Sequence, residues 1–139
     1  TRTVVLIGGF VVLFSVIISI VNSSGILDLL CKIINPFLKA LNIDSRFSSG
    51  IISGIIELTN GVSIISSISV KAISINVIFC AFLLGFGGIS VVLQVFSIVS
   101  EAGISIKPYI LGKFLQGIFA ALYTFLIINN FQIFNLDLI

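Results

Sequence analysis

The sequence predicts an all-α integral membrane protein, from its composition, the length of its apolar runs and the places where polar residues interrupt them. Of its 139 residues, 58% are hydrophobic and only 9% are charged, and the mean hydropathy is +1.34. Soluble domains carry about 25% charged residues. The few charged side chains of this chain could not cover a surface that is exposed to water. Since a helical span needs about 20 apolar residues, we expect about two full spans, an interfacial amphipathic helix, one re-entrant helical hairpin and one broken transmembrane helix.

The first apolar run, residues 3–21, predicts a full transmembrane helix. It carries no charge. Its many β-branched residues do not argue for a strand, because lipid offers no partners for the backbone polar groups that a lone strand would expose. The run is also too long for a signal peptide and lacks a small-residue cleavage signature.

The next segment has the two faces of an amphipathic helix. Its polar residues recur with helical spacing, at Asp28, Lys32, Asn35, Lys39 and Asn42. Leucine, isoleucine and phenylalanine side chains occupy the opposite face. This division is typical of a helix lying flat in the headgroup region, here kinked at Pro36. An amphipathic helix packed on another part of the protein is the alternative.

Residues 47–70 predict a re-entrant helical hairpin. The segment is long enough to cross a bilayer, but its centre reads Glu57-Leu58-Thr59-Asn60-Gly61. A carboxylate deep in a membrane is costly unless it faces protein or water. Asn60-Gly61 favours a break, so two arms of half a span each, residues 47–56 and 62–70, would flank a polar tip. Gly50 and Gly54 have the spacing that lets two helices approach closely.

Residues 73–99 predict a broken transmembrane helix. The run is interrupted by Gly85-Phe86-Gly87-Gly88-Ile89-Ser90, and three glycines in four positions favour unwinding. Such a break is tolerated at membrane depth only where neighbouring groups or a cavity satisfy the freed backbone. Residues 109–128 predict a last full span, with Gly117 and Ala121 as a small packing face.

The chain predicts a single membrane domain over residues 1–139. No stretch has the composition of a linker or of a second domain. Because the first residue is Thr1 and the sequence contains no methionine, we expect a fragment of a longer protein, with processing of the chain as the alternative.

The residue types exclude most catalytic chemistry, so we expect no enzyme activity and no cofactor. The chain has no histidine, which removes imidazole acid–base catalysis and His-based zinc sites. No Lys-Ser or Lys-Thr follows Gly88, as a phosphate-binding loop requires. Cys31 and Cys80 form no redox or metal motif, and we expect no catalytic residue and no bound metal. Basic residues are scattered, so nucleic acid is not an expected partner.

What remains is a predicted binding site between the two interrupted segments. Glu57, Thr59 and Asn60 at the hairpin tip would face the exposed carbonyls of the unwound stretch, with Ser90 and Gln94 beside them. Hairpins and broken helices that meet near the bilayer midplane supply such groups in transporters. Two simpler interpretations stay open. Glu57 could only cap or cross-link helices, and the glycines could only permit close packing.

These motifs also resemble a known family. The residues that carry the resemblance are Glu57-Leu58-Thr59-Asn60-Gly61, Gly85-Phe86-Gly87-Gly88-Ile89-Ser90-Val91, Gln94, Lys107-Pro108-Tyr109 and Gly112-Lys113. They resemble the carboxy-terminal half of sporulation integral membrane proteins that carry the nucleoside-recognition, or gate, domain. That domain also occurs in spore maturation proteins and ferrous-iron transport permeases. A more distant similarity is to concentrative nucleoside transporters, in which a hairpin tip and an unwound helix contact the nucleoside.

The resemblance implies one gate-type repeat, a transporter-like or channel-like half that binds a small solute or cation at the membrane midplane. The two interrupted segments and the resemblance together give the expected binding residues, which are Glu57, Thr59, Asn60, Gly61, Gly85, Phe86, Gly87, Gly88, Ser90 and Gln94. The implied partners are the lipid bilayer and a second repeat, upstream in the same chain or in another copy of it. The implied location is the bacterial cell membrane, including the spore or forespore membrane. A structural or assembly protein of the spore membrane, without transport, is the rival interpretation.

Overall fold

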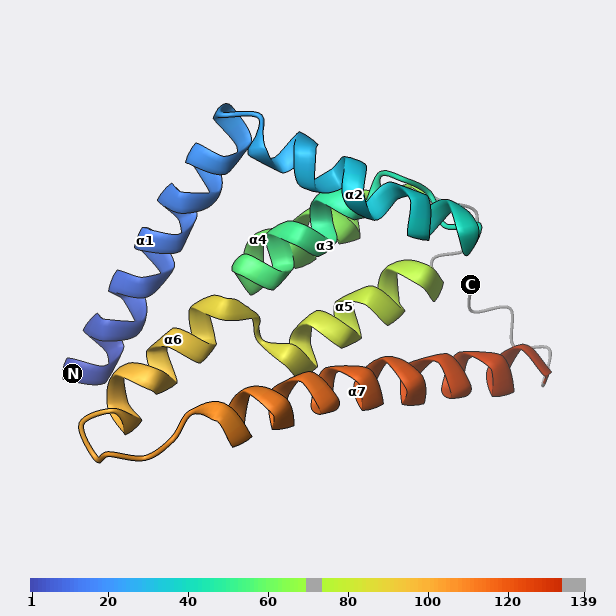
Figure 1. The fold of residues 1–139 in the computed structure, drawn as a ribbon. Coiled ribbons are helices and arrows are strands. Elements are labelled where there is room, and N and C mark those ends of the chain that lie inside the picture. The colour runs from blue at the N-terminus through green and yellow to red at the C-terminus, as the bar shows by residue number, and fades with distance from the viewer. Residues whose placement is uncertain (70–73, 134–139) are drawn as a thin grey trace.

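The computed structural model describes residues 1–69 and 74–133, and every regular element in these ranges is an α-helix (Figure 1). The helices, in chain order, are α1 (Arg2–Ser23), α2 (Ile26–Ala40), α3 (Phe47–Ile56), α4 (Leu58–Ser67), α5 (Ser74–Phe86), α6 (Gly88–Val99) and α7 (Lys107–Ile133). The predicted all-α class is confirmed.

Three stretches are long and apolar enough to cross a bilayer. They are Arg2–Ser23, Ser74–Val99 and Lys107–Asn130, with hydropathies of 3.0, 2.3 and 1.7. The second combines α5 and α6 across their break. At 1.5 Å per residue each is at least as long as a bilayer core of about 30 Å is thick. The chain therefore has the helices of a multi-pass membrane protein.

Helices α3 and α4 pack closely against each other as an antiparallel pair. A Cβ atom on Gly61 would lie 2.1 Å from the Cα of Gly54, and one on Gly50 would lie 2.5 Å from a side-chain carbon of Ile65. The two backbones therefore touch where Gly61 meets Gly54, whereas Ile65 of α4 fills the space beside Gly50 and Leu83 of α5 fills the space beside Gly54. The two arms form one compact element, which we call the hairpin (residues 47–69).

The open end of the hairpin is tied together by Arg46. Its Nη2 donates to the carbonyl of Ser69 at 3.0 Å and to Asp44 Oδ2 at 2.7 Å. Hydrogen bonds from the Arg46 side chain and backbone lower the pKa of Asp44 to about 2. The chain therefore enters and leaves the hairpin at one place. That this place lies at one membrane surface remains a prediction.

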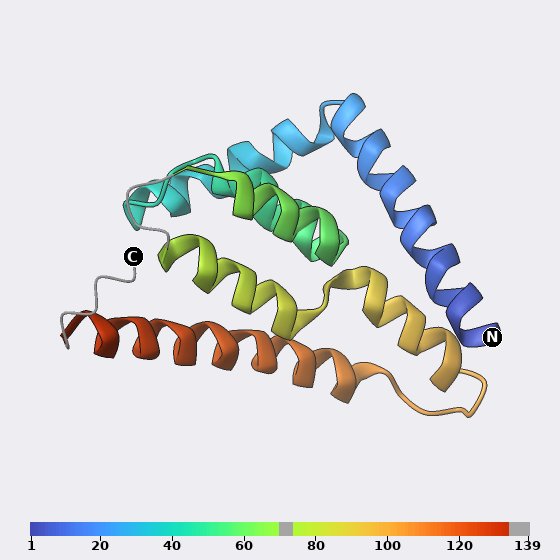
Figure 2. The same ribbon diagram turned by 180° about the vertical axis from the view of Figure 1, so that it is seen from behind.

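Helices α5 and α7 run side by side in both views of the fold (Figures 1 and 2). A Cβ on Gly85 would lie 2.8 Å from the Cα of Gly117, and one on Gly117 would lie 3.0 Å from the carbonyl of Phe82. The Phe82 ring meets Phe114 edge to face at 6.3 Å between centroids. Small residues again set a close helix contact, with Gly117 in the packing role predicted for it.

The core joins α2 to the hairpin and to α5. Its buried members are Leu38, Phe47, Ile65 and Leu83. Outside it, large apolar side chains are exposed on every long helix, and α1 buries only Phe14 and Ile18. Apolar exposure on this scale marks surfaces that lipid or another protein covers.

Helix α2 carries three different faces. Leu27 and Leu38 are buried against the rest of the chain, whereas Ile33 and Phe37 are 60% and 71% exposed. The charged residues Asp28, Lys32 and Lys39 are also exposed, and they lie on the opposite side of the Leu27–Leu38 face from Ile33 and Phe37. The amphipathic pattern is therefore real, and α2 continues through Pro36. Its placement in the headgroup region remains a prediction.

Candidate functional site

The tip of the hairpin is a single residue, Glu57. Its backbone is extended (φ −145°, ψ 121°), so α3 ends before it and α4 begins after it. The carboxylate accepts hydrogen bonds from the backbone N–H groups of Thr59 (3.1 Å) and Asn60 (3.0 Å), from the Thr59 hydroxyl and from Asn60 Nδ2 (3.2 Å). Only 3% of Glu57 is exposed. Glu57 therefore caps α4 by satisfying amides that the first helical turn leaves free.

The tip is narrower than the sequence suggested. Asn60-Gly61 was expected to break the helix, but both residues lie in the first turn of α4. Glu57 stops the preceding helix instead, because its capping bonds require an extended backbone. Gly61 is needed for a different reason, since only a residue without a Cβ fits against Gly54.

The break between α5 and α6 is also short. Unwinding was expected over residues 85–90, but Gly85 and Phe86 complete α5, and Ser90 lies within α6. The turn is made by Gly87 (φ 86°) and Gly88 (φ 80°), both in the left-handed region that favours glycine. The N–H of Gly87 donates to the Leu83 carbonyl at 2.7 Å and closes α5.

The two breaks touch each other. A Cβ on Gly88 would lie 3.0 Å from the Gly54 carbonyl oxygen and 3.2 Å from the Leu58 nitrogen. The carboxyl end of α3, which carries partial negative charge, therefore abuts the amino end of α6, which carries partial positive charge. This contact brings together the two interruptions that the sequence singled out, with backbone rather than a cavity between Gly88 and the tip.

The remaining predicted residues fall into two groups. Gly85 and Phe86 lie at the end of α5, next to α7. Gly85 packs on Gly117, and Phe86 stacks on Phe82 at 6.2 Å. The second group lies on α6, where Gln94 Nε2 donates to the hydroxyl of the buried Ser90 at 3.3 Å.

Two buried polar residues were not assigned a role from the sequence. Asn76, 4% exposed, donates from Nδ2 to the carbonyls of Ile65 (2.7 Å) and Ile68 (2.8 Å), and so satisfies the end of α4. Ser53 is fully buried one turn before Glu57, and its hydroxyl has no partner among the described residues. A lone asparagine in an apolar run was the available signal for Asn76.

The arrangement offers hydrogen bonds and partial charges rather than a reactive centre. In residues 1–69 and 74–133, no group of three His, Cys, Asp or Glu residues is placed to hold a metal ion. The chemical resources are carbonyls at the end of α3, amides at the start of α6, and the side chains of Glu57, Thr59 and Asn60. Such groups bind a solute or ion by coordination and hydrogen bonding.

Comparisons with known proteins identify the family of the chain. The family model described as "Gate: Nucleoside recognition" matches residues 4–105. The chain is similar to the sporulation integral membrane protein YlbJ of Bacillus subtilis (strain 168), with 32% identity over 126 residues that cover 91% of this chain and 31% of that protein. The chain thus spans about a third of the length of this relative. No solved structure matches it. With three helices able to span a bilayer, the chain is a multi-pass membrane protein that belongs to the gate, or nucleoside-recognition, family.

Proposed function

We propose that the chain is one gate-type repeat of a sporulation-associated membrane protein that moves or senses a small solute or ion. The hairpin tip and the α5–α6 break together form the binding site, near the bilayer midplane. The family description, nucleoside recognition, makes a nucleoside the first solute to test. The name of the similar Bacillus subtilis protein supports a role in sporulation, in the cell membrane or the forespore membrane.

The observation that carries this proposal is the backbone contact between Gly88 and Gly54. Two helix interruptions in a membrane chain are each costly, and a purely structural fold has no need to bring them into contact. In transporters, discontinuous helices meet in this way because their ends supply partial charges and free backbone groups to a ligand. Separation of Gly88 from Gly54 would offer the carbonyls of α3 and the amides of α6 to a solute.

A second repeat is part of the proposal. Helix α4 exposes a stripe of hydroxyls on the side away from α3, formed by Thr59, Ser63 and Ser66. Exposed hydroxyls suit a water-filled cavity or a polar partner better than lipid. Transporters of this architecture place their sites between two repeats, and the similar protein is about three times as long as this chain.

A structural or assembly role is the second candidate, and one observation favours it. All four hydrogen bonds of the Glu57 carboxylate come from its own helical turn. A carboxylate used in this way stabilises α4 whether or not a solute ever binds.

The test replaces Glu57 with Gln in the full-length protein, reconstituted in lipid nanodiscs, and measures binding of uridine and adenosine by calorimetry. We expect Glu57→Gln to lower nucleoside affinity at least about tenfold, with a loss of thermal stability of the order of one capping interaction, about 1 kcal/mol. Asp44→Asn, which removes a carboxylate from an exposed loop, should leave affinity unchanged. Loss of stability with unchanged binding would favour the structural role.

A further inference from the structure

A polar seam runs the length of α6. Ser90, Gln94, Ser97 and Glu101 are spaced four, three and four residues apart, so they lie on one face of the helix and of the turn that follows it. The rest of the helix surface is dominated by valine, leucine, isoleucine and phenylalanine. Exposure increases along the seam, from 2% at Ser90 through half-buried Gln94 and Ser97 to exposed Glu101.

One hydrogen bond joins two side chains of the seam, from Gln94 Nε2 to the Ser90 hydroxyl at 3.3 Å. The Ser97 hydroxyl donates to the backbone carbonyl of Gln94 at 2.7 Å. At 1.5 Å per residue, the seam extends about 16 Å from the break to the end of the helix. Its inner end, Ser90, is two residues from Gly88, where the break meets the hairpin tip.

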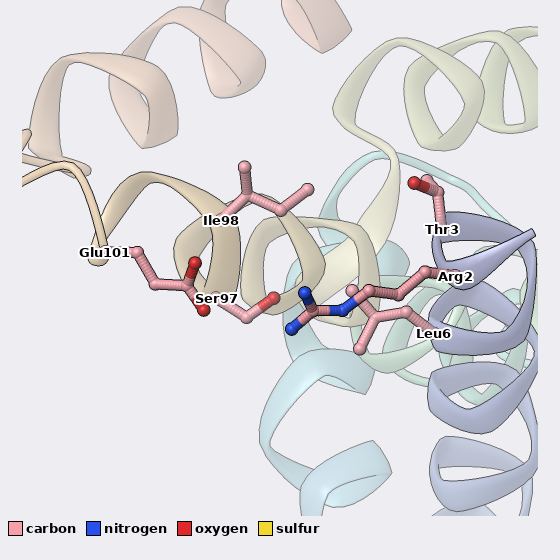
Figure 3. A pocket seen from close by; sticks show the side chains of 6 residues that line it. All are labelled: Arg2, Thr3, Leu6, Ser97, Ile98 and Glu101. Atoms are coloured by element: carbon pink, nitrogen blue, oxygen red, sulfur yellow. The ribbon is translucent and has the colours of Figure 1, made fainter.

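The outer end of the seam opens into a pocket between α6 and the start of α1. The pocket has a volume of about 190 Å³ and is lined by Arg2, Thr3, Leu6, Ser97, Ile98 and Glu101. One water needs only about 10–15 Å³ of such a cavity, so several waters fit. Figure 3 shows Arg2 reaching from α1 toward Ser97 and Glu101. Within residues 1–69 and 74–133 the one ion pair joins Asp44 to Arg46, so Arg2 and Glu101 line the pocket without closing it.

We propose that this pocket is the aqueous mouth, and the α6 seam the hydrated route, by which a small uncharged polar solute reaches the break between α5 and α6. This inference rests on the proposed function, because it supplies the path to that site. Hydroxyl and carboxamide groups along the route can exchange hydrogen bonds with a neutral solute or with water. The opposite charges of Arg2 and Glu101 at the mouth balance, so neither sign of ion is favoured there.

Cysteine accessibility tests the route in the full-length protein, in sealed vesicles, with Cys31 and Cys80 replaced by Ala. Ser97→Cys, Gln94→Cys and Ser90→Cys are each treated with a membrane-impermeant cationic methanethiosulfonate. The matched control is Leu93→Cys, which is on the same helix but outside the seam. Leu93 is 39% exposed, and we expect it to face lipid. A thiol needs water to ionise and react, so the three seam positions should each react at least about tenfold faster than Leu93→Cys, and in that order. Reaction at Ser97→Cys alone, or at no seam position, would overturn the route.

The charges at the mouth give a second readout. Glu101→Gln should slow the cationic reagent at Ser97→Cys several-fold and speed its anionic sulfonate analogue, whereas Arg2→Gln should do the reverse. Unchanged reaction rates in both variants would show that Arg2 and Glu101 do not line the mouth of the route. No solute is added in these measurements. An open seam in a protein that binds no nucleoside would therefore contradict a nucleoside as the solute and leave the route standing.

Discussion

At the scale of single residues, glycine decides which helices can touch. Gly54 and Gly61 bring the hairpin arms together, Gly85 and Gly117 bring α5 against α7, and Gly88 lets α6 begin against the hairpin tip. In lipid, helices gain little by burying apolar surface, so close backbone packing carries more of their association than it does in water. A methyl group added at these positions should therefore lower the stability of the protein by more than the small size of the group suggests.

Gly61→Ala tests this intolerance most sharply. The added Cβ would meet backbone atoms of Gly54 at 2.1 and 2.4 Å, and backbone cannot move aside as a side chain can. We expect a loss of about 1–3 kcal/mol or more, the usual range for overpacking, measured as a lower Tm of helical circular dichroism in detergent. Gly112→Ala is the matched control, because that helical glycine has open space around it. Equal Tm values for the two variants would contradict the packing described.

The residues of the site could be identified from the sequence where their type is unusual for a membrane segment. Glu57 was identified because a lone carboxylate in an apolar run is rare, and Gly50 and Gly54 because their spacing has one use in membranes. The extent of each break could not be predicted. Whether Asn60-Gly61 ends a helix depends on the capping bonds of Glu57 and on the partner that Gly61 faces, and neither is encoded in the local pattern.

At the scale of elements, the hairpin is closed at its tip by Glu57 and at its base by Arg46. The base contact joins residues that are 23 positions apart, and the bond from Asn76 to Ile65 spans 11 positions. Neither contact follows a periodicity, so the partners in these two bonds could not be predicted, although the lone asparagine in an apolar run marked Asn76 as unusual. The helical arms themselves were predictable because apolar length and a central polar interruption are local properties.

The Asp44–Arg46 pair should make the base of the hairpin sensitive to acid. The folded-state pKa of Asp44, about 2, lies below its ordinary value of 3.8, so the carboxylate stabilises the folded loop fully above about pH 4. That contribution is lost as the pH falls through about 2. We predict that the wild type is more stable than Asp44→Asn at about pH 5, and that the difference vanishes near pH 2. A difference that persists in acid would mean that Asp44 acts other than through its charge.

The hairpin should enter and leave the membrane on one side. Ser45 and Ser69 are exposed and flank the Arg46 contact that ties the two ends together. Val70, the last residue of the hairpin predicted from the sequence, and Lys71 after it lie outside the described residues. In sealed vesicles, with native cysteines replaced, Ser45→Cys and Ser69→Cys should react with an impermeant maleimide from the same face. Labelling from opposite faces would turn the hairpin into a full crossing.

At the scale of the whole molecule, the chain combines three candidate spans with two helix interruptions that meet. Helix α1 is barely attached to the rest, whereas the hairpin, α5 and α7 form a continuous packed unit (Figures 1 and 2). The fold class was predictable from hydropathy alone. The meeting of the two breaks was expected by resemblance to transporters, and no periodicity or composition could have supplied the contact between Gly88 and Gly54.

The contact between the breaks is the feature on which the proposed function depends, and substitutions at two adjacent glycines can test it separately. Gly87 and Gly88 share a positive φ, so alanine at either position carries similar backbone strain. Alanine at Gly88 would also press on the Gly54 carbonyl at 3.0 Å, whereas at Gly87 the nearest atom is the Lys113 Cε at 3.5 Å. The decisive measurement is uridine and adenosine binding by the two variants in nanodiscs, beside their Tm values. Gly88→Ala should lower the Tm further than Gly87→Ala, and at a temperature where both variants are folded it should lower nucleoside affinity at least about tenfold relative to Gly87→Ala. Equal affinities in the two variants would contradict a binding site formed where the breaks meet.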